Sequence, residues 1–337
     1  MAYAAFSPKG FKAWVIEETV TGNNLGALDS PAITSGLLQL DVDSVAYPSI
    51  APNQNVDVRT SIGRVAHKND FFQDDVIRAT EVSLSGTYHN DTGHILLMQS
   101  ACGVALQSTV ADVAIPTAST TVSGKYGESE ANKTFTLVLA PPDTTDGYNI
   151  VMVGCLCTNF TISADTGTEG GIYKWSATIS TGMKPITNNT TTEAGTAYTS
   201  APISINTLTG ATTVNSIAST VLSSFSVSVD SPAVYSGFSA NGYHTYGRAP
   251  ELAVTADVQV KYDSVTRPIL NNFNTQSAAD EADMLTLTQA TANNCSIAIG
   301  AGVLTNAALS EGDIMMMDVS IKAVNVGNNI IAFNLAA

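Results

Sequence analysis

The chain has 337 residues, of which 44% are hydrophobic and only 13% charged, and its formal net charge at pH 7 is −15. A chain of this length can bury two domain cores, and a Thr- and Val-rich sequence with few long helical periods favours an all-β class. The acidic balance argues against tight binding to duplex DNA, which needs basic groups to displace counterions, and no stretch approaches the roughly 18 apolar residues of a membrane span.

The N-terminal residues 1–35 contain one strand-like run, residues 11–20, among glycine-, asparagine- and proline-rich punctuation. We predict that residues 1–35 form an N-terminal arm that packs on another body, such as a neighbouring subunit. Charged residues interrupt any apolar core of signal-peptide length in this region. The first strand of the body is expected over residues 36–46.

Residues 48–78 form a long connection, and long connections inside compact domains are usually functional or contact a partner. We predict that this loop contacts an adjacent subunit, the alternative being a β-hairpin flap folded onto its own domain. Its shorter counterpart, residues 232–250, is aromatic, which suits an interface. The candidate interface residues are Arg59, Arg64, His67, Lys68, Phe71 and Phe72 in the first loop, and Tyr235, Phe238, Tyr243 and Tyr246 in the second.

Regular elements are predicted next. Residues 80–89 alternate as a strand, residues 90–93 offer a helix N-cap, and residues 94–101 form a short helix that ends at Cys102 and Gly103. Residues 104–132 are expected to be loop with an extra hairpin, and residues 134–140 another strand. A long hairpin follows over residues 150–182, in which alternation places Val151, Val153, Cys155 and Cys157 on one face of its first strand.

The order of these elements is repeated after a polar stretch, residues 183–220, which we interpret as a linker or an ordered strap between two halves. The second copy covers residues 221–337, with a helix over residues 264–273 and a last strand over residues 330–335. Three correspondences support the repeat: Leu38–Ser44 with Phe225–Ser231, Cys155–Cys157 with Ile297–Ile299, and the Glu169-Gly170 turn with Glu311-Gly312.

Motifs for chemistry are not found. The four histidines are dispersed, and the four cysteines fit buried, reduced side chains better than a metal site. The carboxylate pairs Asp41/Asp43 and Asp165/Glu169 lack the spacing of an EF-hand, so turn and solvent roles are favoured over a Ca²⁺ site. We therefore expect no enzyme, no cofactor and no metal.

With the repeat, the sequence resembles the tail tube (major tail) proteins of long-tailed bacteriophages. The resemblance is carried by residues 38–78, by the strand–helix unit of residues 81–103, and by the run SADTGTEGGIYKWSAT at residues 163–178. It implies a mainly β fold with two tandem β-sandwich, barrel-forming domains, residues 36–182 and 221–337, each flanked by a short helix. It also implies trimeric, pseudo-hexameric rings that stack into a negatively charged conduit for DNA.

The partners that this resemblance implies are other copies of the chain and other tail proteins: the tape measure, the tail terminator, and the baseplate or tip. DNA would pass without specific binding, and the protein would reside in the virion after assembly in the host cytoplasm. Two alternatives stay open. One is another phage or surface β-sandwich protein, such as a capsid-decoration or fibre protein. The other is a carbohydrate-binding or hydrolytic β-sandwich with the aromatic cluster of residues 235–246 as its platform.

Overall fold

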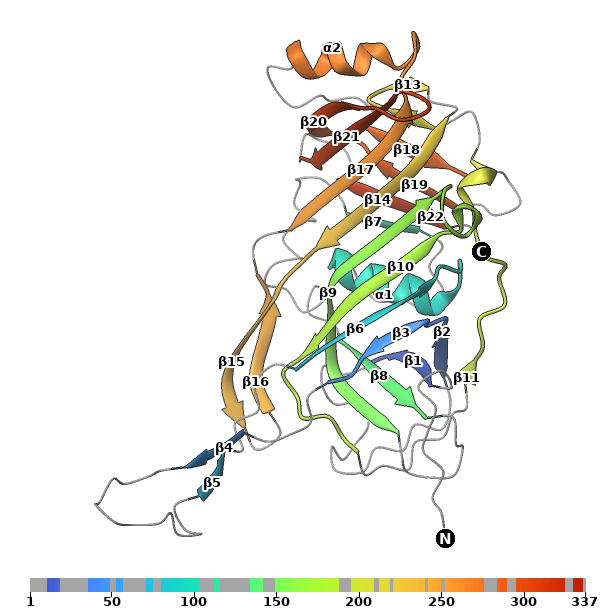
Figure 1. Ribbon diagram of the computed structural model, residues 1–337. Helices are drawn as coiled ribbons and strands as arrows, with labels where there is room; N and C mark the ends of the chain where they lie inside the picture. Colours follow the sequence, from blue (N-terminus) through green and yellow to red (C-terminus); the bar gives the residue numbers. More distant parts are fainter. Residues whose placement is uncertain are drawn as a thin grey trace, which may run out of the picture.

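The computed structural model describes residues 11–18, 36–48, 53–56, 71–74, 80–103, 112–115, 134–141, 149–187, 195–208, 212–218, 221–239, 242–249, 252–275, 284–289, 295–324 and 330–335. Over these ranges the chain is mainly β and contains two α-helices, as Figure 1 shows, so the predicted fold class is confirmed.

Four antiparallel strands from the first part of the chain lie side by side, and we call them the first strand set. The set begins at a short outer strand and ends at a strand of 16 residues. In spatial order its members are β3 (Ser44–Ala46), β6 (Thr80–Thr87), β10 (Lys174–Thr181) and β9 (Ile150–Asp165).

Four further antiparallel strands form the second strand set. Its first member pairs with the Asn159–Asp165 part of β9, so the two sets make one continuous sheet (Figure 1). In spatial order its members are β14 (Leu222–Asp230), β17 (Ala253–Lys261), β21 (Met316–Ala323) and β20 (Gly302–Ser310).

Each strand set carries the same two additions in the same chain order. A β-hairpin lies between its first and second strands, and a helix follows its second strand. The hairpins are β4 (Asn53–Val56) with β5 (Phe71–Asp74), and β15 (Ala233–Ser239) with β16 (Gly242–Arg248); the helices are α1 (Thr92–Cys102) and α2 (Arg267–Thr275).

Both helices were predicted within three residues of their observed bounds. The chain leaves α1 at Gly103, whose φ of 63° is the left-handed conformation that glycine adopts without a Cβ penalty. Asp263 precedes α2, and its Oδ1 accepts hydrogen bonds from the backbone N–H groups of Val265 (2.8 Å) and Thr266 (3.1 Å).

The N-terminal half of β9 extends the sheet in a second direction through β8 (Phe135–Ala140), β1 (Lys12–Glu17), β2 (Leu37–Leu40) and β11 (Gly195–Thr196). Strand β1 falls within the region predicted to be an N-terminal arm. It lies instead between β2 and β8, with Ala13, Trp14 and Val15 buried, so this part is an interior strand of the sheet.

A separate six-stranded sheet mixes both parts of the chain. One of its strands, β7, comes from residues 104–132 and pairs with β22, the last strand. The sequence predicted the strand β22 but not this pairing. In spatial order the members are β13 (Ile217–Ala218), β12 (Thr213–Val214), β18 (Leu285–Thr288), β19 (Cys295–Ile299), β22 (Ile331–Leu335) and β7 (Asp112–Ile115).

The described parts of residues 183–220 are attached along the body, as expected for an ordered strap. Isolated bridges join Ile186 to Val151 and Pro202 to His89. The His89 ring also contacts the strap, since its Nδ1 lies 2.7 Å from the Ser200 carbonyl oxygen. Its Nε2 lies 2.9 Å from Asp41 Oδ2, outside the strap.

Three details of the predicted hairpin and repeat are wrong. Val151 and Val153 do not share a face with Cys155 and Cys157: they belong to a different apolar cluster, because Gly154 adopts a φ of 64° and resets the alternation of β9. The strand paired with β21 is β20, so residues 297–299 of β19 are not the partners of that strand.

The correspondence of Leu38–Ser44 with Phe225–Ser231 also fails. Residues 44–46 pair with β6 in the same way that residues 224–226 pair with β17, so residues 44–46 correspond to residues 224–226. The predicted strand of residues 36–46 is in fact two strands, because β2 pairs with β1 whereas β3 pairs with β6.

Candidate functional site: the polar face and edges of the sheet

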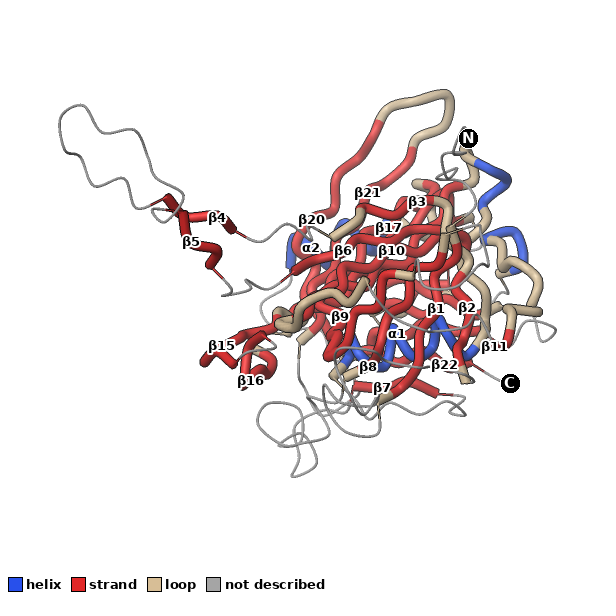
Figure 2. Tube along the Cα trace, turned by 90° about the horizontal axis from the view of Figure 1, so that it is seen from below, coloured by secondary structure: helices blue, strands red, loops and turns tan. Residues whose placement is uncertain are grey.

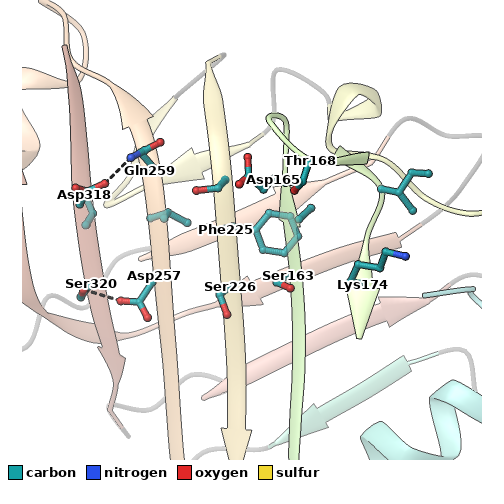
Figure 3. A pocket seen from close by; sticks show the side chains of 15 residues that line it. Ser163, Asp165, Thr168, Lys174, Phe225, Ser226, Asp257, Gln259, Asp318 and Ser320 are labelled. Carbon is teal, nitrogen blue, oxygen red and sulfur yellow. Dashed lines mark hydrogen bonds between the residues drawn. The ribbon is translucent and has the colours of Figure 1, made fainter. Parts of the chain in front are cut away.

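One face of the continuous sheet is polar along both strand sets. Strands β6, β14 and β17 bury side chains in alternation, and the residues between are mostly Ser, Thr, Gln and Asp. Paired registers align them into rows: Ser320, Asp257, Ser226, Ser163 and Lys174 form one row, and Asp318, Gln259, Ser224 and Asp165 the next (Figure 3).

The charged side chains of this polar face are more often acidic than basic. A hollow of about 570 Å³ lies over it, lined by β9, β10, β14, β17 and β21. By strand register the acidic members are Glu81, Asp165, Asp230, Asp257 and Asp318, and the basic members are Lys174, Lys261 and Lys322.

Hydrogen bonds within the face engage several of these charges. Gln259 Nε2 donates to Asp318 Oδ1 at 2.8 Å, and Ser320 Oγ donates to Asp257 Oδ1 at 2.6 Å, both drawn in Figure 3. Lys174 Nζ lies 3.1 Å from Asp43 Oδ2 at the outer end of the first strand set. The face therefore offers hydroxyls and carboxylates rather than a run of free cations.

The junction of β9 and β14, which we call the internal seam, is closed on both faces. On the core face, Ile162 and Val227 are paired and each is 1% exposed. On the polar face, Asn159 Nδ2 donates to Ser228 Oγ at 3.2 Å, and Thr161 Oγ1 donates to the same oxygen at 3.0 Å.

A family model described as phage tail tube protein matches residues 13–324, which is most of the chain. The chain belongs to the phage tail tube protein family. A comparison with curated proteins found no significant match. Membership makes the chain a structural component of the phage tail, which agrees with a candidate site made of a broad sheet face and strand edges.

Three general observations accompany this assignment to the tail tube family. Within the described ranges, no helix is long and apolar enough to cross a membrane. The same ranges contain no group of three or more His, Cys, Asp or Glu side chains that could together hold a metal ion. All four cysteines are buried and none is in a disulfide, and burial raises the pKa of Cys157 and of Cys295 to about 12.

The first predicted loop of this tail tube protein is partly described. Its strands β4 and β5 pair with each other, and Figures 1 and 2 both show this hairpin standing away from the body. Phe71 and Phe72 lie on β5, opposite Val56 and Asn55. Arg59, Arg64, His67 and Lys68 lie outside the described residues, so their interface role stays a prediction.

The second predicted loop forms the hairpin of β15 and β16. Phe238, Tyr243 and Tyr246 lie on it, at positions whose side chains are not among those described. Tyr235 is half-buried, and its hydroxyl donates to Ser180 Oγ of β10 at 2.9 Å. Burial raises the pKa of Tyr235 to about 12. This hairpin therefore touches the first strand set of its own chain.

Arg248, at the end of β16, was missed by the sequence reasoning. It is 8% exposed, and its guanidinium donates at 2.8 Å to the backbone carbonyls of Cys157 and Ser231 and also to that of Ser100 in α1. It thus ties the second hairpin to β9 and to the first helix. A lone arginine after a Tyr- and Gly-rich run carries no sequence signal for burial.

Proposed function

We propose that this chain forms the phage tail tube as stacked trimeric rings with pseudo-sixfold symmetry, each chain supplying two fused tail-tube domains. The observation that carries the proposal is the repeated order of strands. Each set of four has its hairpin after the first strand and its helix after the second. The internal seam then represents one of two kinds of domain contact in the ring, the other being the contact between chains.

The repeat is supported by an irregularity that both sets share. Strand β9 has a bulge at Thr158, where its register with β10 shifts, and β20 has a bulge at Thr305 against β21. The Thr158 Oγ1 donates to the Thr178 carbonyl at 3.1 Å, and the Thr305 Oγ1 donates to the Ser320 carbonyl at 3.2 Å. A bulge with the same side-chain bond at the same place favours duplication of one ancestral unit.

The polar face would line the bore of the tube. Its hydroxyls have no charge to offer phosphates, and its surplus of carboxylates repels them, so DNA could slide without being held. Closing the sheet into a barrel also removes its free edges, which otherwise pair with other chains without control. The protein would assemble in the host cytoplasm, with the tape measure, the tail terminator and the baseplate or tip as further partners.

Electron microscopy of the purified protein, negatively stained at high concentration, tests this function. We expect hollow tubes with regular striations and threefold features in end views. Compact trimers that never stack would instead favour a decoration protein, and a chain that stays monomeric at every concentration in sedimentation would overturn the proposal.

The projecting hairpin gives a second test. Replacing Phe71 and Phe72 together by serine should leave folded protein that no longer polymerises, because this hairpin stands away from the body in Figures 1 and 2. Circular dichroism checks the fold and light scattering follows polymerisation. Unchanged polymerisation would remove this loop from the assembly contacts.

A further inference from the structure

The outer strand of each strand set has one neighbour among the described strands: β3 pairs with β6, and β20 pairs with β21. The internal seam shows how such edges can join within this chain. There, β14 and β9 pair over seven residues, from Ser224 opposite Asp165 to Asp230 opposite Asn159.

The shared bulges make the two strand sets comparable residue by residue. The residue after each bulge is an asparagine, Asn159 in β9 and Asn306 in β20. Following the paired residues across each set gives two equivalent rows: Asn159, Thr178, Ser83 and Ala46 in the first set, and Asn306, Ser320, Asp257 and Ser226 in the second. Hence Leu309 is equivalent to Ile162, and Tyr47 to Val227.

The exposure of these four residues differs in a consistent way. Ile162 and Val227 face each other across the internal seam and are each 1% exposed. Tyr47 and Leu309, at the equivalent positions of the two free edges, are each 43% exposed. A large apolar side chain is thus exposed at each edge, whereas its equivalent at the internal seam is buried. Because both side chains are apolar, each could be buried by packing against the other.

The backbone N–H and C=O groups at the two edges have the same orientation as their equivalents at the internal seam. Thr166 N–H donates to the Ser223 carbonyl at 2.9 Å, so alternation makes Ile162 and Val227 a hydrogen-bonded pair. At the edge of β20, Tyr262 N–H donates to the Met315 carbonyl at 2.9 Å, which fixes the alternation in β21 and leaves the backbone groups of Leu309 pointing outward. The Tyr47 groups point outward from β3 by the same alternation, given the pairing of Tyr88 with Tyr173.

From these equivalences we propose that β20 of one copy pairs antiparallel with β3 of the next copy, in the register that places Leu309 opposite Tyr47 and Ser310 opposite Ala46. The occupant of each free edge is a second copy of this chain. This inference rests on the proposed ring, and it adds which strands meet and in which register.

A pair of cysteines tests the register. Ala46 and Ser310 are equivalent to Ser226 and Ser163, which alternation makes a non-hydrogen-bonded pair, with Cβ atoms about 4.5–5.5 Å apart. That separation is within reach of a disulfide after small adjustment. The variant Ala46→Cys plus Ser310→Cys should give disulfide-linked dimers and trimers on a non-reducing gel when assembled protein is oxidised. The four native cysteines are buried, so they do not compete.

The matched control is Ala46→Cys plus Asn306→Cys, which moves the second thiol roughly 13 Å along the strand on the same face. Linking in the first variant and none in the control supports the proposed register. Tubes in which only the control links would overturn the register while leaving the tube function intact. A wild-type chain that never assembles would overturn the tube function, and this register with it.

A charge at the edge gives an independent readout. Leu309→Lys should leave the melting temperature of the monomer unchanged, because the side chain is already half exposed, and should abolish assembly in sedimentation velocity. Leu309→Met is the control, because it keeps an apolar side chain of similar volume at the same position. If Leu309→Lys assembles as the wild type does, the seam lies elsewhere.

Discussion

The two helices follow the same strand of their sets, yet one is covered and the other is open. In α1 every residue from Gly93 to Cys102 is buried, whereas in α2 only Ile269 is. Helix α1 touches β9, β1, β2 and β7, and Arg248 reaches it from the second hairpin, while α2 touches β20. Among the described residues, the chain thus covers its first helix and leaves the second open, and under the proposed ring a neighbouring copy would cover the second.

The largest expected difference comes from removing one leucine from each helix. Leu97 is fully buried in α1, so Leu97→Ala should lower the free energy of unfolding by about 2–5 kcal/mol. Leu270 is half-buried in α2, so Leu270→Ala should cost about 1 kcal/mol. Urea denaturation of the unassembled protein measures both. Equal losses would mean that α2 is as well packed in the single chain as α1.

Arginine replacements should show a slightly smaller difference. Arg248→Met leaves the carbonyls of Cys157, Ser231 and Ser100 without these donors, which should cost about 3 kcal/mol. Arg267→Met, at the exposed start of α2, should stay within about 0.5 kcal/mol of wild type. A calorimetric melting temperature that falls equally in both variants would contradict the clamp role of Arg248.

A titratable group inside α1 sharpens the comparison further. The His94 ring lies 5.2 Å from that of Trp175 and 5.6 Å from that of Tyr88, and no hydrogen-bond partner of its nitrogens is found in the described part of the chain. Burial, with a smaller contribution from nearby His89, lowers the pKa of His94 to about 3. Helix α2 contains no histidine.

This lowered pKa predicts a loss of stability in acid. The unfolded chain takes up a proton on His94 near pH 6.5 and the folded chain only near pH 3, so between these values the unfolded state binds more protons. Stability from this group is therefore lost as the pH falls, by about 2 kcal/mol between pH 7 and pH 5. In His94→Leu the pH dependence should be weaker by that amount, as urea denaturation at the two pH values would reveal. An unchanged dependence would rule out a neutral, buried His94.

Elements with a local sequence signal were predicted well. The alternation of β6 and β10, the end of α1 at Gly103 and the last strand β22 all depend on neighbouring residues, and the structure contains each of them. Asp91 stands at the predicted N-cap of α1, but its side chain makes no capping hydrogen bond there and accepts one from the Ser200 N–H. The Asp165 turn also follows local chemistry, since Asp165 Oδ1 accepts a hydrogen bond from the Gly167 N–H at 2.7 Å.

Features that depend on distant residues were missed. The left-handed Gly154 exchanges the faces of β9, and its N–H donates at 2.8 Å to the buried carboxylate of Glu18, far away in the sequence. The pairing of β7 with β22 and the burial of Arg248 likewise need contacts between opposite ends of the chain. Tyr47 and Leu309 had no signal, because single exposed apolar residues are common on protein surfaces.

The smallest expected effects concern the two bulge threonines, where the strand sets should behave alike. Thr158→Val and Thr305→Val each remove one hydroxyl bond to a carbonyl while keeping the β-branched shape. We expect a cost of about 1 kcal/mol at half-buried Thr158 and about half of that at exposed Thr305, where water can replace the bond. The two residues lie in different strand sets and their hydroxyls donate to different carbonyls, so the double variant should show the sum of the two losses in urea denaturation. A stabilising effect at either position would mean that its bulge is held by the backbone alone, and would weaken the argument that the bulges are equivalent.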